Sequence, residues 1–212
     1  MVERSPWYIK ICGVTTLGDA NAVIDAGASA LGLILTKSPR KLSLDRALAI
    51  AAATKGRIVR TAVFDDDGDD VVLEAVDLLD VDAVQLHGPL SDSLLAALRE
   101  RGLTIVKALS IGSDEFFDFD ERTVDMVLID GALPGSGRAH SWDELGARQF
   151  NVPVIAAGGL RPDSVAQLIT LIDVWGVDTA SGVESSPGIK DRELVKRFVD
   201  DATTAFEQRA NA

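Results

Sequence analysis

Two side chains in this sequence could exchange protons with a small substrate. Cys12 is the only cysteine of 212 residues and ends the apolar run 7–12, directly before a glycine, and Asp130 ends the apolar run 124–130. A thiolate can act as a base or a nucleophile, and a carboxyl group as a general acid. Both also have structural interpretations, because free cysteine often packs as a small hydrophobe and aspartate often caps a helix or loop. The residues alone leave these alternatives open.

Two glycine-containing loops near the C-terminus indicate an anion site. Gly158 and Gly159 follow one apolar run, and Ser181 and Gly182 follow the next. Glycine lets backbone N–H groups approach a phosphate closely, and a helix N-terminus adds further donors. Either loop alone could simply form a tight turn. Their occurrence in two successive loops predicts a bound phosphate.

Further charged and polar side chains stand where apolar runs end. Lys10, Arg40 and Lys107 are cations that could hold a nearby thiol in its ionised form. His87 ends the run 83–87, where a hydrogen-bonded structural histidine is the preferred interpretation and a substrate contact is the second. The acidic run 65–70 lacks the regular ligand spacing of a calcium loop, so a solvated loop is expected.

Eight short apolar runs must position these residues. Each is rich in Val, Ile or Leu nearly throughout, which is typical of strands buried on both faces of a parallel sheet. The runs are 7–12, 29–35, 58–64, 83–87, 104–108, 124–130, 152–157 and 175–179. The alternation of such strands with helical patterns predicts an α/β fold.

The segments between the runs carry helix signals. Thr15 or Thr16, Ser43 and Ser91 can cap helices, Pro162 suits a first helical position, and an apolar face runs through 190–206. The pattern is weakest over 113–119. Eight units in 212 residues give about 26 residues each, which predicts one (β/α)8 TIM barrel over 1–212.

An open, doubly wound sheet is the alternative to a barrel. The first run is not followed by the G-x-G-x-x-G pattern of dinucleotide-binding sheets, and no linker divides the chain into domains. In a TIM barrel the active site lies at the C-terminal ends of the strands. Polar residues at those ends are therefore the functional candidates.

Composition excludes several classes of partner. The net charge of −12, from 21 basic and 33 acidic residues, disfavours nucleic acid and anionic membranes. No apolar run approaches the ~20 residues that span a bilayer, and the first ten residues lack the apolar region of a secretory signal. A single cysteine is consistent with a reducing compartment, so a cytoplasmic location is expected. A monomer is also expected, because no exposed apolar stripe is evident.

Several motifs together carry a resemblance to a known family. They are KICGVTT (10–16), KSPRKLS (37–43), AVQLHG (83–88), VLIDG (127–131), AGGLRPDSV (157–165) and VDTASGVESSPGIKD (177–191). With these motifs the chain resembles phosphoribosylanthranilate isomerase of tryptophan biosynthesis, a small phosphate-binding barrel. The resemblance extends over nearly the whole chain.

The resemblance implies an Amadori rearrangement of N-(5-phosphoribosyl)anthranilate, without a metal or an organic cofactor. It implies that Cys12 is the general base and Asp130 the general acid, and that Arg40 contacts the anthranilate carboxylate. The acid needs a raised pKa, whereas the base gains from nearby positive charge. The remaining expected contacts are Lys10, His87 and Lys107 for the substrate and Gly158, Gly159, Ser181 and Gly182 for its phosphate.

The chain departs from the usual family pattern at His140, Ser141 and Ala180. These departures leave room for a related aminated phosphoribosyl substrate, as in histidine biosynthesis. That family generally has an aspartate where this chain has Cys12. A non-catalytic phosphosugar-binding protein is the other alternative, but it would need neither Cys12 nor Asp130.

Overall fold

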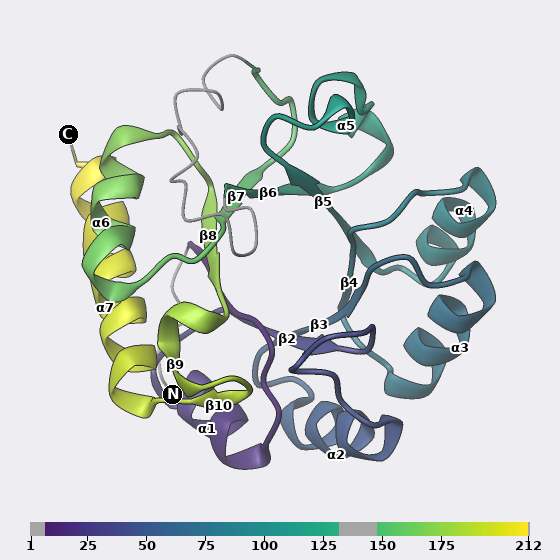
Figure 1. The fold of residues 1–212 in the computed structure, drawn as a ribbon, viewed down its shortest axis with the longest axis horizontal. Coiled ribbons are helices and arrows are strands. Elements are labelled where there is room, and N and C mark those ends of the chain that lie inside the picture. Colours follow the sequence, from purple (N-terminus) through teal and green to yellow (C-terminus); the bar gives the residue numbers. More distant parts are fainter. Residues whose placement is uncertain (1–6, 132–147, 212) are drawn as a thin grey trace.

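Eight parallel strands close into a barrel. The structure, a computed structural model, describes residues 7–131 and 148–211. The strands follow one another around the barrel in chain order, and β8 pairs with β1 to close it (Figure 1). They are β1 Tyr8–Ile11, β2 Ala30–Ile34, β3 Val59–Phe64, β4 Ala83–Leu86, β5 Thr104–Ser110, β6 Met126–Asp130, β7 Val154–Ala157 and β8 Gly176–Thr179. All eight predicted strands are confirmed.

Helices form a ring outside the strands, as Figure 1 shows. The α-helices of the described residues are α1 Leu17–Asp25, α2 Leu44–Thr54, α3 Asp69–Leu79, α4 Asp92–Glu100, α5 Asp114–Asp118, α6 Pro162–Leu171 and α7 Arg192–Ala210. The predicted (β/α)8 barrel is therefore confirmed. The connection between β6 and β7 lies largely outside the described residues.

The sequence predicted most helix ends correctly. The hydroxyls of Thr16 and Ser91 accept hydrogen bonds from backbone N–H groups in the first turns of α1 and α4. The last helix was predicted from residue 190, which is wrong. Lys190 ends a two-residue strand, β10 (Ile189–Lys190), which pairs with β9 (Glu184–Ser186), and Asp191 caps α7.

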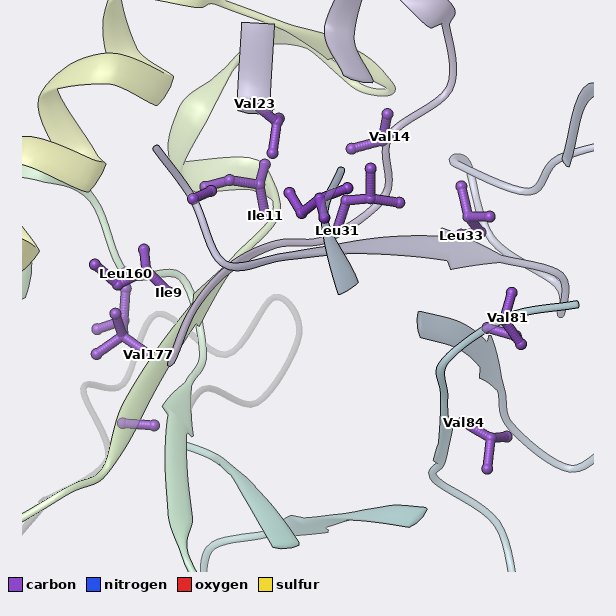
Figure 2. Close-up of a cluster of buried hydrophobic side chains, with 14 of the residues drawn as sticks. Ile9, Ile11, Val14, Val23, Leu31, Leu33, Val81, Val84, Leu160 and Val177 are labelled. Atoms are coloured by element: carbon purple, nitrogen blue, oxygen red, sulfur yellow. The ribbon is translucent and has the colours of Figure 1, made fainter. Parts of the chain in front are cut away.

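The apolar core has two layers, because successive side chains of each strand point to opposite faces. The outer layer packs strands against helices, with Ile11 of β1 near Val23 of α1 and Ile9 beside Val177 of β8 (Figure 2). The inner layer fills the barrel and includes Tyr8 of β1. Lys10 and Cys12 follow Tyr8 at intervals of two residues, so their side chains also point to the interior. This periodicity brings the thiol to the mouth of the barrel.

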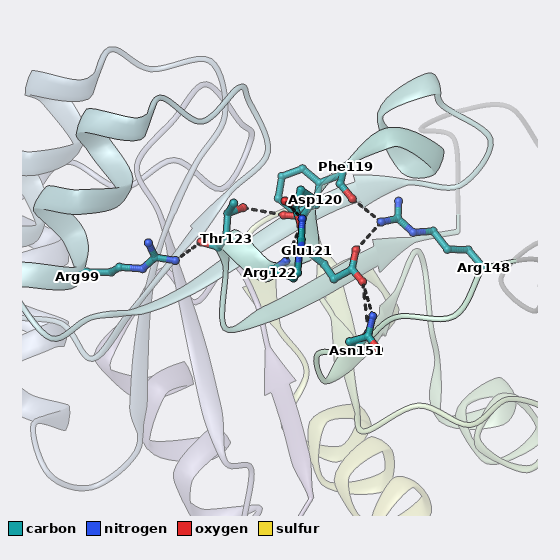
Figure 3. Close-up of polar contacts among 8 residues, drawn as sticks. All are labelled: Arg99, Phe119, Asp120, Glu121, Arg122, Thr123, Arg148 and Asn151. Atoms are coloured by element: carbon teal, nitrogen blue, oxygen red, sulfur yellow. Dashed lines mark hydrogen bonds and ion pairs between the residues drawn. The ribbon is translucent and has the colours of Figure 1, made fainter.

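A polar cluster joins residues 148–151 to the segment after α5. Arg148 donates to the carbonyls of Phe116 and Phe119 and pairs with Glu121 at 2.7 Å (Figure 3). The Asn151 side-chain amide donates to the other carboxylate oxygen of Glu121 at 3.0 Å. Both oxygens of this carboxylate thus have protein donors.

Candidate active site

A cavity of about 580 Å³ opens at the C-terminal ends of the strands. Its wall contains residues from the ends or following loops of seven of the eight strands, all but β5. Seven predicted site residues lie in this wall, namely Cys12, Arg40, His87, Asp130, Gly158, Gly159 and Ser181. The other three, Lys10, Lys107 and Gly182, do not line it. The barrel therefore brings most of the predicted site together.

Cys12 sits directly after β1 with its thiol buried in the cavity wall. Its backbone N–H donates to the Thr179 carbonyl at 2.8 Å, which fixes the residue against β8. The neighbouring strand contributes Gly32, where a Cβ atom would lie 2.7 Å from the Cys12 sulfur. The space for the thiol therefore depends on the missing side chain of Gly32.

Burial raises the pKa of the Cys12 thiol above its ordinary value, although the charges of Lys10 and Lys190 oppose this effect. Asp178 acts in the same direction as burial. The sequence predicted that nearby cations would favour the thiolate. The structure supplies those cations, but desolvation outweighs them and favours the protonated thiol.

Lys10 lies two residues before Cys12 and is completely buried inside the barrel. Acceptors of the protein bind its ammonium group. Its Nζ donates to Gln85 Oε1 at 2.8 Å and pairs with Asp178 Oδ2 at 3.0 Å. Burial is the largest single influence and lowers the pKa of Lys10, but the effects of Asp178, Cys12 and Tyr8 together outweigh burial and raise the pKa, so the group stays charged. Lys10 therefore pairs with Asp178 and favours the ionised form of Cys12. The structure does not support the direct substrate contact that was expected.

Asp178 is a site residue that the sequence reasoning missed. It belongs to β8, lines the cavity and pairs with Lys10 through Oδ2. Its other oxygen, Oδ1, is buried and has no hydrogen-bond partner among the described residues. A buried acceptor without a donor costs free energy, which a hydroxyl or N–H of a bound ligand would recover.

His87 joins the same chain of polar groups. Because Lys10 donates to Gln85 Oε1, the Gln85 amide nitrogen faces His87 and donates to Nε2 at 2.8 Å. Nε2 is then the acceptor, and the proton of the neutral ring is on Nδ1. Desolvation, and then the charge of Lys10, lower the pKa of His87 and keep it neutral. The ring is hydrogen-bonded, as preferred, but it also lines the cavity, which supports the second interpretation.

Lys107 has a structural task instead of the expected substrate contact. Its Nζ donates to the carbonyls of His87 and Gly88 at 2.7 and 2.8 Å and pairs with Glu115 at 2.9 Å. These three acceptors use the three N–H donors of the ammonium. The side chain is fully buried and has no donor left for a ligand. Lys107 thus fixes the loop after β4 that carries His87.

The two glycine loops contribute differently to the wall. Gly158 and Gly159 line the cavity with φ of +106° and +70°, a region that favours glycine. Gly182 lies in the short turn after β8, where a Cβ atom would lie only 1.8 Å from the Leu160 carbonyl oxygen. Gly182 is therefore required for packing the two loops together. Ser181, beside it, is the residue that reaches the cavity.

Asp130 faces the cavity from the end of β6. By the shorter route around the barrel, β7 and β8 separate β6 from β1, so the carboxyl and the Cys12 thiol enter one cavity from different sides. Two of the departures from the family pattern, His140 and Ser141, lie outside the described residues. The third, Ala180, lines the cavity beside Ser181.

Arg40, in the loop after β2, forms a two-point ion pair with Glu184 of β9. Glu184 also accepts from Lys190 at 2.9 Å. The motifs of the sequence contain Glu184, Lys190 and Gln85, but none of the three was predicted as a site residue. A buried polar residue within an apolar run was the available signal for Gln85 and Asp178.

Features outside the cavity bear on the remaining expectations. The described residues contain no group of three side chains suited to a metal ion and no helix that could cross a membrane. The expectation that no apolar stripe is exposed is wrong on one face. Leu44 of α2 and Val71 and Leu78 of α3 are exposed around a groove of about 240 Å³. A monomeric state therefore stays a prediction.

Comparison with known proteins identifies the family. Residues 9–201 match the family model described as N-(5'phosphoribosyl)anthranilate (PRA) isomerase. The chain belongs to this family. A relative from Myxococcus xanthus (strain DK1622), named N-(5'-phosphoribosyl)anthranilate isomerase, is 40% identical over 201 residues, which are 90% of this chain and 93% of the relative.

Solved structures agree with this assignment. The crystal structure of phosphoribosyl anthranilate isomerase from Thermotoga maritima has a TM-score of 0.82 and 29% identity, covering 93% of this chain and 99% of that one. A phosphoribosyl anthranilate isomerase in complex with reduced 1-(o-carboxyphenylamino)-1-deoxyribulose 5-phosphate has a TM-score of 0.79 and 29% identity, with the same coverage. The ligand of that complex carries a phosphate, a sugar chain and an aromatic carboxylate.

Proposed function

We propose that this chain converts N-(5'-phosphoribosyl)anthranilate to 1-(2-carboxyphenylamino)-1-deoxyribulose 5-phosphate, with Asp130 as general acid and Cys12 as general base. The observation that carries this assignment is the meeting of these two side chains, from β6 and β1, in one cavity whose wall also contains the glycine loop after β7. An isomerisation of this kind needs one acid and one base on different sides of a sugar.

The reaction begins at the furanose ring. Asp130 gives a proton to the ring oxygen, the bond from that oxygen to C1 breaks, and the nitrogen lone pair forms a C1–N double bond. The ring oxygen leaves as a hydroxyl group, and the nitrogen carries a positive charge. This cationic Schiff base acidifies the hydrogen on C2, which is the next proton to leave.

Cys12 then removes the C2 proton. Its thiol is protonated before substrate binds, because burial raises its pKa, so it must first lose this proton to solvent. A cation within about 4–6 Å favours the charged form of an acidic group, so the Schiff base lowers the pKa of the thiol when the base is needed. Lys10 stabilises the thiolate from beneath. The resulting enolamine takes a proton at C1 from the Cys12 thiol, and its C2 hydroxyl gives its proton to the Asp130 carboxylate, which forms the ketone and restores the acid. The Cys12 thiolate then regains a proton from solvent, so atoms and protons balance over the cycle.

The rest of the cavity binds the two charged ends of the substrate. The phosphate lies against Gly158, Gly159 and Ser181, where glycine backbone without side chains lines the cavity and lets a phosphate approach closely. The anthranilate carboxylate lies against Arg40, whose planar group suits a carboxylate. The orphaned oxygen of Asp178 accepts a hydrogen bond from the sugar chain. A reactive thiol in the site suits a reducing compartment, and we place the enzyme in the cytoplasm.

Turnover of freshly prepared N-(5'-phosphoribosyl)anthranilate, followed by the loss of its fluorescence, tests this function. The wild-type chain should consume the substrate without added metal or cofactor. Asp130→Asn should bind the reduced product analogue normally and have a kcat at least ~10²-fold lower, the usual contribution of a general acid. Absence of turnover by the wild type would contradict the function, and an Asp130→Asn variant with normal kcat would contradict the assignment of the acid.

A further inference from the structure

Glu184 holds the guanidinium of Arg40 at the edge of the cavity. Its Oε1 accepts from Arg40 Nε and its Oε2 accepts from Arg40 Nη2, both at 2.7 Å. The two residues are 144 positions apart and come from the loops after β8 and β2. Glu184 therefore fixes both the position and the plane of the Arg40 side chain.

Glu184 is itself held by buried groups. Only 4% of its side chain is exposed, and Lys190 Nζ donates to its Oε1 at 2.9 Å. Lys190 is also buried and donates to the Ala180 carbonyl at 2.9 Å. Burial by itself raises the pKa of Glu184, but the hydrogen bonds from Arg40 and Lys190 outweigh it and hold the pKa below its ordinary value. The carboxylate thus stays ionised and stationary.

The stem of Arg40 is confined from a second direction. It crosses Gly13, the residue after Cys12, where a Cβ atom would lie 2.5 Å from Arg40 Cδ. Gly13 also has φ of +70°, so both the backbone and the lack of space require glycine. Arginine normally has a large number of rotamers, and a flexible guanidinium must lose this freedom when a ligand binds. Here the folded chain has already restricted it.

The pairing leaves one edge of the guanidinium unused. Glu184 occupies the Nε–Nη2 side, and Nη1 has no hydrogen-bond acceptor among the described residues. Arg40 itself lines the cavity. The charges of Arg40, Glu184 and Lys190 sum to +1, so a second carboxylate approaching the open edge still meets net positive charge.

We infer that Glu184 is a positioning residue that makes the site specific for substrates with a carboxylate on the aromatic ring. It does so by presenting the Nη1–Nη2 edge of Arg40 to that carboxylate, and Lys190 supports it. This inference rests on the proposed contact between Arg40 and the anthranilate carboxylate. The opposite arrangement, in which Glu184 competes with the substrate for Arg40, predicts tighter binding when Glu184 is neutralised.

The test compares two substrates that differ only in the carboxylate. These are N-(5'-phosphoribosyl)anthranilate and N-(5'-phosphoribosyl)aniline, each made from ribose 5-phosphate and the corresponding amine. The kcat and KM of the wild type, Arg40→Ala and Glu184→Gln are measured with both. The matched control is Asp77→Asn, which disrupts a two-point pair with Arg101 at 2.6 and 2.8 Å on the helical surface.

Glu184→Gln should raise the KM for the anthranilate substrate about tenfold, because the hydrogen bonds of Arg40 to a charged partner are lost. Its kcat should change little, and its KM for the aniline substrate should stay within about twofold of the wild type. Arg40→Ala should show the same selectivity with a larger effect. Asp77→Asn should match the wild type on both substrates.

Three results separate the possible failures. If Arg40→Ala affects both substrates equally, the proposed carboxylate contact is wrong and this inference falls with it. If Arg40→Ala is selective for the anthranilate substrate but Glu184→Gln is not, only the inference about Glu184 is overturned. A lower KM for Glu184→Gln also overturns it, in favour of competition. Circular dichroism and thermal unfolding confirm that each variant is folded.

Discussion

Glu121 and Glu184 are two carboxylates that pair with an arginine from a distant segment, but they leave their arginines in different states. Arg148, the partner of Glu121, donates to two carbonyls as well as to the carboxylate, and its guanidinium lies 4.4 Å from the centre of the Phe150 ring. Arg40, the partner of Glu184, uses one edge and presents the other to the cavity.

The difference separates a structural polar cluster from a functional one. Around Glu121 both carboxylate oxygens and both terminal guanidinium nitrogens of Arg148 have protein partners, and none of these residues lines the cavity. The cavity wall, in contrast, contains groups without partners among the described residues, such as Arg40 Nη1 and the buried Oδ1 of Asp178. A buried group without a partner, such as Asp178 Oδ1, costs stability, and both groups contribute to ligand binding because a ligand can satisfy them.

The largest effect is expected from Gly32→Ala, which changes the site without touching a charge. The new methyl group would lie 2.7 Å from the Cys12 sulfur, so the thiol must shift away from the substrate. A displacement of about 1 Å in a reacting group costs about 10²-fold in rate, and kcat should fall accordingly. Gly68→Ala, at a position with open space, is the matched control. An unchanged kcat for Gly32→Ala would show that the thiol position is not critical.

Glu121→Ala should lower the stability of the protein and leave its activity unchanged. It leaves Arg148 and Asn151 without their shared acceptor, and the free energy of unfolding should fall by about 1–3 kcal/mol. Denaturant titration measures this loss, while kcat and KM should equal those of the wild type. A kinetic defect at full folding would contradict the division between the two clusters.

The ionisation of Cys12 provides a finer test, because two neighbouring residues shift the pKa of its thiol in opposite directions. Lys10 lowers the pKa of the thiol and Asp178 raises it. The rate of alkylation by iodoacetamide at pH 7 should therefore fall about threefold or more in Lys10→Met and rise in Asp178→Asn. In the wild type this rate should keep increasing above pH 8.5, the ordinary value for cysteine. Equal pH profiles for both variants would contradict the electrostatic assignment.

The smallest effect concerns acid stability. The backbone N–H of Glu121, and then Asn151 and Arg148, lower the pKa of this carboxyl against the effect of burial. A carboxyl with a lowered pKa contributes stability above its unfolded pKa of about 4.3, and the contribution is lost as the pH falls through the folded value. Glu121→Gln should therefore lose less stability than the wild type between about pH 5 and pH 3. Identical losses would contradict this linkage.

The fold was predictable because local signals repeat along the chain. Eight apolar runs gave the eight strands, and caps such as Thr16 and Ser91 gave helix starts. The helix boundary at Lys190 failed because the two-residue strand β10 depends on pairing with β9, which no local pattern shows. The weak pattern over 113–119 corresponds to the short helix α5 and the turn after it.

The sequence indicated which residues lie at the site, but not which groups they contact there. Strand ends indicated Cys12 and Asp130, whereas three-dimensional neighbours decided the tasks of Lys10 and Lys107. Lys10 belongs to β1 and Lys107 to β5, but their ammonium groups are held by acceptors 75 and 20 positions away. The same holds for Glu184, whose task is visible only once the loop after β2 lies beside it. Sequence patterns give the periodicity of a barrel, and the closing of the barrel determines which charges meet.

The most direct test of the central claim is a single-turnover measurement on Cys12→Ser with excess enzyme and N-(5'-phosphoribosyl)anthranilate. Excess enzyme isolates the chemical step from product release. The account predicts that the fluorescence decay is at least ~10²-fold slower than in the wild type, because a serine hydroxyl is a far weaker acid and so ionises far less readily than a thiol. Binding of the reduced product analogue should be unchanged. A decay as fast as that of the wild type would contradict the role of Cys12 as the base.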